Sequence, residues 1–160
     1  MGMTMKKDFR KTLNFFSIFA EKNLDMGIYS DRLMLQKIVY ILQEAGINFE
    51  YYFNWYVKGP YSTRLAAESF EFFEENKHYK TAKLNSHEEK IAMTIKKQLG
   101  EFMKTEKEIE ILGSLVFIIR QLKIKEKDKI IEKLISLKPW YEKQEIEMIL
   151  DKIEKSLFFN

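Results

Sequence analysis

Hydrophobic residues recur at helical spacing along most of the chain, which predicts a mainly helical protein. The pattern predicts helices over residues 6–24 and 30–46, and Gly46 suits the end of the second. Further helices are predicted to begin near residues 62 and 86. Another helix is predicted over 105–122, a shorter one ends near 137, and a last one covers 142–157. The helix over 105–122 is apolar nearly all round, so we expect it at the centre of a bundle.

Several of these helices have a residue suited to cap their first turn. Ser30 and Ser62 precede apolar runs, and a serine hydroxyl accepts a hydrogen bond from a free backbone N–H there. Ser86 and Thr105 each stand three residues before a glutamate, the spacing of a capping box.

Between the second and third predicted helices, the hydrophobic period changes from 3.6 to 2. Aromatic and polar residues alternate over 49–57, which predicts a strand, and Gly59-Pro60 breaks the chain after it. A lone strand needs a partner, either the segment 79–84 or the same strand of another copy. The expected fold is therefore mainly α: a compact bundle of about six to seven helices with a short antiparallel β-ribbon inserted after the second, residues 1–160 forming a single domain.

Composition and charge exclude several classes of site. The chain has no cysteine, which excludes a disulfide framework, a thiolate nucleophile and cysteine-ligated metals. Its 27 basic and 24 acidic residues give a net charge of +3, without a polybasic arm. The first six residues resemble neither a signal peptide nor a myristoylation site, and the longest apolar run, 111–119, is too short for a bilayer. We expect a cytoplasmic protein with no membrane partner.

Three short motifs near this strand resemble those of known prokaryotic families. They are Leu-Gln-Lys-Ile-Val-Tyr-Ile-Leu at 35–42, Phe-Asn-Trp-Tyr at 53–56 and Gly-Pro-Tyr-Ser at 59–62. This series resembles the YwgA-like family of uncharacterised prokaryotic proteins and, more distantly, the Panacea domain, whose members include antitoxins and proteins of mobile elements. Lys-Pro-Trp-Tyr at 138–141 also resembles the YwgA-like pattern. The resemblance to Panacea implies an antitoxin-like role in which the domain neutralises a partner, by analogy of fold.

The aromatic strand and the turn after it are the candidate partner-binding surface. Tyr52, Asn54 and Tyr56 share one face of the strand, and tyrosine buries a large area at low entropic cost in protein interfaces. An anionic group of a partner could bind at the helix start beyond the turn. The candidate residues there are Lys58, Gly59, Pro60, Tyr61 and Arg64. The alternative is that the tyrosines pack under a helix and that Gly-Pro-Tyr-Ser is ordinary turn and cap chemistry.

Gln36, Lys37 and Tyr40 form a second candidate group on the helix over 30–46. They either hydrogen-bond to the Gly-Pro turn and fix its geometry, or face a partner. The two histidines, His78 and His87, are expected on the surface, and no catalytic, metal or cofactor motif is present.

These observations favour a protein–protein interaction module, antitoxin-like or a regulator linked to mobile elements or defence. The alternative is a winged-helix-like DNA-binding transcriptional regulator, because two helices followed by a β-ribbon loosely match that order. The helix that would contact DNA is neutral, because Arg32 and Lys37 are balanced by Asp31 and Glu44. Phosphate contacts need a net positive charge on one face. An enzyme is not expected, and a homodimer is possible through the predicted strand.

Overall fold

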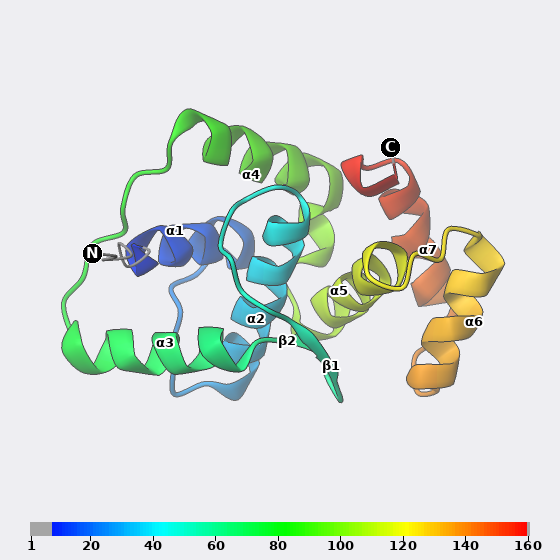
Figure 1. The fold of residues 1–160 in the computed structure, drawn as a ribbon, viewed down its shortest axis with the longest axis horizontal. Helices are drawn as coiled ribbons and strands as arrows, with labels where there is room; N and C mark the ends of the chain where they lie inside the picture. The colour runs from blue at the N-terminus through cyan, green and yellow to red at the C-terminus, as the bar shows by residue number, and fades with distance from the viewer. Residues whose placement is uncertain (1–7, 160) are drawn as a thin grey trace, which may run out of the picture.

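The computed structural model describes residues 8–159 and contains seven α-helices, two short strands and two 3-10 turns in that range (Figure 1). The two strands form one antiparallel sheet directly after the second helix, so the predicted mainly α fold with an inserted β-ribbon is confirmed. The elements are α1 (Phe9–Ala20), α2 (Tyr29–Glu44), β1 (Asn54–Tyr56), β2 (Gly59–Tyr61), α3 (Thr63–Glu75), α4 (Ser86–Leu99), η1 (Gly100–Phe102), α5 (Glu106–Arg120), α6 (Lys127–Leu137), α7 (Lys143–Glu154) and η2 (Leu157–Phe159).

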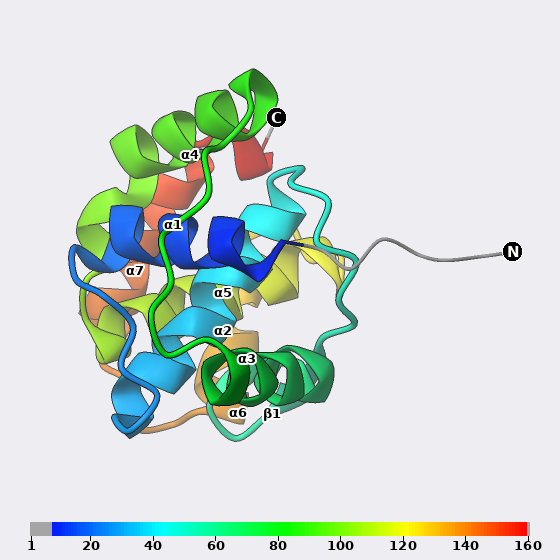
Figure 2. The same ribbon diagram turned by 90° about the vertical axis from the view of Figure 1, so that its left-hand side faces the viewer.

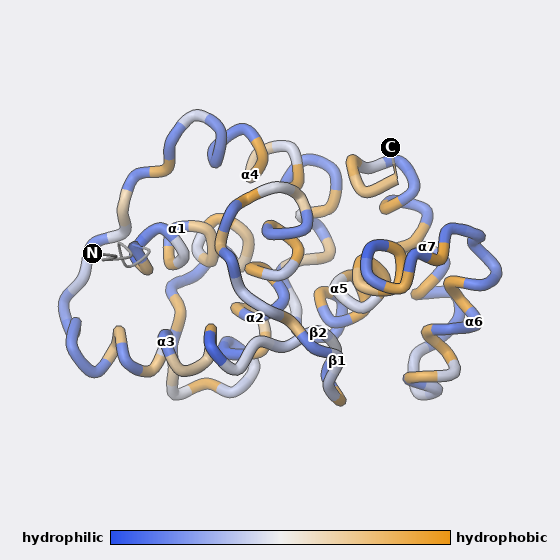
Figure 3. The backbone as a smooth tube through the Cα atoms, in the orientation of Figure 1, coloured by the Kyte–Doolittle hydropathy of each residue, from blue (hydrophilic) through white to orange (hydrophobic). Residues whose placement is uncertain are grey.

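Helices α2 and α5 pack against each other at the centre of the molecule. Residues 33–42 of α2 and 109–116 of α5 are buried without interruption, which confirms the central place predicted for the fifth helix. Helix α1 packs on α2, whereas α6 and α7 pack on α5. Figure 3 shows hydrophobic residues recurring along α1, α2 and α5. No helix within residues 8–159 combines the length and the apolar character needed to cross a membrane.

The predicted helix ends are correct in part. Ser62 caps α3 by accepting a hydrogen bond from the Leu65 N–H (3.2 Å), and Thr105 caps α5. The capping box of α4 lies one residue earlier than predicted, because Asn85 and Glu88 form it in place of Ser86. Ser30 lies inside the first turn of α2 and caps nothing.

Helix α1 is shorter than predicted. Asp8 caps its start, and Glu21 ends it in a left-handed conformation with φ of 58°. The helix therefore stops well before residue 24. Residues 6 and 7 of the predicted helix, and the first six residues considered for targeting, lie outside the described residues.

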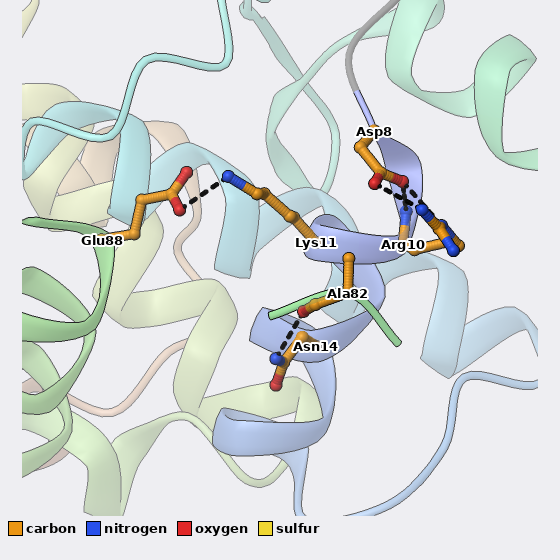
Figure 4. Close-up of polar contacts among 6 residues, drawn as sticks. All are labelled: Asp8, Arg10, Lys11, Asn14, Ala82 and Glu88. Carbon is orange, nitrogen blue, oxygen red and sulfur yellow. Dashed lines mark hydrogen bonds and ion pairs between the residues drawn. The ribbon is translucent and has the colours of Figure 1, made fainter. Parts of the chain in front are cut away.

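The long connection between α3 and α4 is held against α1 and forms no strand, so the segment 79–84 predicted as the partner of the aromatic strand does not fill that role. The Asn14 side-chain amide donates to the Ala82 carbonyl (2.9 Å), and the Ala82 N–H donates to the Arg10 carbonyl (3.3 Å). Lys11 forms an ion pair with Glu88 (3.0 Å) at the start of α4 (Figure 4).

The aromatic strand is shorter than predicted and pairs with the Gly-Pro segment itself. Only Asn54–Tyr56 are paired, opposite Gly59–Tyr61. Glu50 adopts a left-handed φ of 60°, which ends the extended run on the N-terminal side. Pro60 fits in β2 because it lies opposite Trp55, at a pair whose N–H groups point away from the partner strand. The hairpin lies at the lower edge of the molecule in Figures 1 and 2.

Candidate functional site

Two glutamines of α2 clamp the backbone at both ends of the segment 51–62. The Gln36 amide donates to the Ser62 carbonyl (2.9 Å) and accepts from the Ser62 N–H (2.8 Å). Gln43 makes the same pair of bonds with Tyr51, at 2.8 and 2.9 Å. The two glutamines are seven residues apart, two helical turns, so they share one face of α2. Each amide satisfies a backbone N–H and C=O together, as a neighbouring strand would.

Two buried lysines hold the turn between these clamps. Lys37 Nζ donates to the Pro60 carbonyl (2.7 Å), and Lys138 Nζ donates to the Val57 carbonyl (2.7 Å). Lys138 also forms an ion pair with Glu110 of α5 (2.7 Å). Each lysine is only 1% exposed. The segment 51–62 is therefore fastened at four points, by side chains from α2 and from the connection between α6 and α7.

Gly59 lets the turn approach this polar cluster closely. Its φ of 92° lies in the region that favours glycine. A Cβ atom there would lie 3.0 Å from Ser114 Oγ and 3.4 Å from Lys37 Cε. A larger residue would therefore strain the backbone and push the turn away from α2 and α5.

Burial lowers the pKa of Lys37 to about 7, because an ammonium group loses its hydration between α2 and the hairpin. The nearby Lys138 and Lys58 lower this pKa further, whereas Glu110 and Glu106 raise it. Burial also lowers the pKa of Lys138, against the opposing effect of Glu110. The amine of Lys37 thus changes its charge near neutral pH while it is held against Pro60.

We predict that Lys37 makes stability rise with pH. Between pH 7 and about 10 the unfolded chain holds a proton on Lys37 that the folded chain lacks, since the ordinary pKa is about 10.4. Unfolding then takes up a proton, and its free energy increases by at most about 1.4 kcal/mol per pH unit. Urea unfolding of the natural chain and of Lys37→Met, compared from pH 6 to 9.5, should show a difference that changes above pH 7 in favour of the natural chain. A difference independent of pH would contradict the prediction.

The hairpin presents one face to solvent and one to the core. Tyr52 is 77% exposed and Tyr56 is 44% exposed, and Asn54 lies exposed between them. On the other face, Phe53 packs edge-on against Tyr40 of α2, and Trp55 packs against Phe117 of α5, with ring centroids 5.1 and 5.2 Å apart. The alternation predicted from the sequence thus separates an exposed face from a packed face.

The remaining predicted residues divide by burial. Lys58 and Arg64 are exposed and Tyr61 is half-buried. Gly59 and Pro60 are buried, so they shape the hairpin from within and offer a partner little surface. Gln36, Lys37 and Tyr40 are all buried, and the first two bind the turn as described above.

Sequence reasoning missed three residues of this region: Gln43, Glu110 and Lys138. Gln43 had a signal, since it lies two turns from Gln36 on the same helix. Glu110 is an acidic residue within an apolar run, and Lys138 precedes the Pro-Trp-Tyr motif. Nothing in the sequence indicates that these last two form an ion pair across 28 positions.

The histidines and the carboxylates are, by residue type, possible catalytic or metal-binding groups. His78 and His87 are exposed, as predicted. Within residues 8–159, no three side chains of the metal-binding types lie close enough to hold an ion.

Helix α2, which would read DNA in the winged-helix alternative, is buried from Leu33 to Leu42. It has no free face there to enter a groove, so that alternative would need a different helix.

Comparisons with protein-family models, with curated proteins and with solved structures found no match for the chain. The resemblance to YwgA-like and Panacea proteins therefore stays a prediction.

Proposed function

We propose that the protein is an interaction module that binds a partner protein through the outward face of its hairpin. The observation that carries this proposal is a row of exposed side chains, Tyr52, Asn54 and Tyr56, on a backbone fastened at four points. Exposed aromatic residues on a rigid backbone bind with a small loss of conformational entropy. We call these three residues, with Val57, Lys58 and Trp140, the hairpin surface.

Trp140 is another exposed aromatic residue, and it lies in the connection between α6 and α7 that holds the turn. It is 61% exposed and follows Lys138 by two residues, and Lys138 holds the Val57 carbonyl. Val57, in the turn of the hairpin, is itself 75% exposed. Tryptophan and tyrosine are enriched among the residues that dominate binding energies in protein interfaces. The hairpin surface therefore combines aromatic anchors with a polar amide and one lysine.

The resemblance to Panacea domains supports a particular kind of partner. An antitoxin-like module covers a functional surface of a second protein, and a regulator linked to mobile elements or defence would bind its target in the same way. Both roles need a preformed contact surface and no catalytic group, which fits the features of the hairpin surface.

The test is capture of the partner from the native host by the tagged chain, with and without nuclease. Replacing Tyr52 and Tyr56 with alanine should lower the affinity for the captured protein at least about tenfold, since aromatic anchors carry most of such binding energy. Both side chains are exposed, so thermal unfolding should change little.

Tyr29→Ala is the matched control, because Tyr29 is 57% exposed but lies at the start of α2. It should retain the partner at natural stoichiometry. Equal capture by the double variant and by Tyr29→Ala would overturn the proposal, and nucleic acid captured in place of a protein would favour the DNA-binding alternative.

A further inference from the structure

Strand β1 has an edge without a partner within residues 8–159. Strand β2 packs on α2 and α5, whereas β1 pairs only with β2. A two-residue turn joins Tyr56 to Gly59, so Tyr56 and Asn54 direct their backbone N–H and C=O groups toward β2. Trp55, and Phe53 before it, direct theirs toward the opposite edge. Neither residue makes a backbone hydrogen bond there within the described chain.

We propose that this edge pairs with β1 of a second copy, antiparallel across a two-fold axis that passes beside Asn54. In this register Phe53 of each copy lies opposite Trp55 of the other. The four free backbone groups of each copy then form four hydrogen bonds across the axis. The pairing continues the hairpin into a four-stranded sheet in the order β2, β1, β1, β2.

The side chains suit this register and orientation. Residues 51–57 carry no charge, and they lie between Glu50 and Lys58. Antiparallel pairing brings the acidic end of each segment toward the basic end of the other, whereas parallel pairing would bring like charges together. Neither Glu50 nor Lys58 takes part in an ion pair within the described chain, and both are exposed.

The exposed tyrosines also meet in this register. Tyr52 of each copy lies opposite Tyr56 of the other at a non-hydrogen-bonded pair, where cross-strand side chains approach most closely. Two Asn54 side chains meet at the axis, where an amide can donate to its symmetry mate. This inference goes beyond the proposed function and does not depend on it, although pairing would place the outward faces of two hairpins side by side.

The absence of cysteine makes a direct test possible. Asn54→Cys places the only thiol of each chain at the axis, where paired Cα atoms lie about 4.5–5.5 Å apart, within the range of a disulfide. Mild oxidation should link this variant into a covalent dimer. Tyr52→Cys is the control, because its two copies lie four residues apart along the strands, roughly 13 Å. A mixture of Tyr52→Cys and Tyr56→Cys should form the mixed dimer.

Exchanging the charges of Glu50 and Lys58 in the chain without introduced cysteines tests the antiparallel orientation. Sedimentation over a range of concentrations should show less dimer for Lys58→Glu than for the natural chain. The double variant Glu50→Lys with Lys58→Glu should restore it, since opposite charges again meet at both ends. A monomer at every concentration would overturn the proposal. A dimer fraction that is the same in the natural chain and in both charge variants would also overturn it. So would an Asn54→Cys variant that forms the covalent dimer no faster than Tyr52→Cys.

Discussion

Lys138→Met is expected to lower the free energy of unfolding by about 3–5 kcal/mol. The ammonium of Lys138 bonds to both the Glu110 carboxylate and the Val57 carbonyl, at 2.7 Å each. Methionine fills a similar volume but donates no hydrogen bond, so a carboxylate that is 7% exposed would lose its counter-ion. A buried charge without a partner costs far more than the pair itself contributes. Urea unfolding followed by circular dichroism measures the change.

A second substitution separates the cost of the unpaired Glu110 charge from the cost of altered packing around residue 138. Adding Glu110→Leu to Lys138→Met removes the uncompensated charge, and most of the lost stability should return. The exposed pair of Lys127 with Asp151 is the control, because both side chains are hydrated and Lys127→Met should change stability far less. If Lys138→Met and Lys127→Met had equal effects, the buried pair would not hold the connection between α6 and α7 against the hairpin.

The helices could be predicted from the sequence because their apolar faces are what the core buries. Helix α5 is the clearest case, since a segment apolar on nearly all sides is stable only when other helices surround it. Exact ends were harder, because several residues compete to cap. Asn85 displaced Ser86 at the start of α4, and asparagine is as strong a cap as serine.

The strand could be predicted only in part, because its limits depend on contacts distant in sequence. Its alternation correctly separates the exposed Tyr52 and Tyr56 from the packed Phe53 and Trp55. Its length depends on Gln43, whose amide takes both backbone groups of Tyr51 and thereby removes them from any strand ladder. The alternation of hydrophobic and polar residues along the strand does not predict such a side-chain clamp.

The candidate site, like the strand, could be predicted from the sequence only in part. Gln36 and Lys37 could be placed near the Gly-Pro turn, since polar residues between buried positions need partners close by. The pair of Lys138 and Glu110 joins a loop to a helix that lies 28 residues earlier. Such pairs are set by the tertiary arrangement of the helices, which the hydrophobic pattern alone does not determine.

Gln36→Leu is expected to destabilise the fold by about 2–4 kcal/mol, because it leaves the buried Ser62 N–H without a partner and removes one of the two hydrogen bonds that the Ser62 carbonyl accepts. Gln36 is 2% exposed and Ser62 is 1% exposed, so water does not replace the lost bonds. Ser62 also caps α3 through its hydroxyl, which accepts from the Leu65 N–H. Loss of the clamp should therefore loosen the hairpin and the first turn of α3 together, which hydrogen exchange at Leu65 and Ala66 would report.

Gln43→Leu is the matched comparison, because it removes the same pair of bonds, made here by a glutamine that is only half-buried. The Tyr51 end of the segment is less deeply enclosed at its clamp, so the expected loss is about 1 kcal/mol, near that of a typical hydrogen bond. Equal losses for the two variants would show that burial at Ser62 adds nothing to its clamp. A larger loss for Gln36→Leu, with faster exchange confined to the hairpin and α3, would show that α2 holds the hairpin chiefly at its Ser62 end.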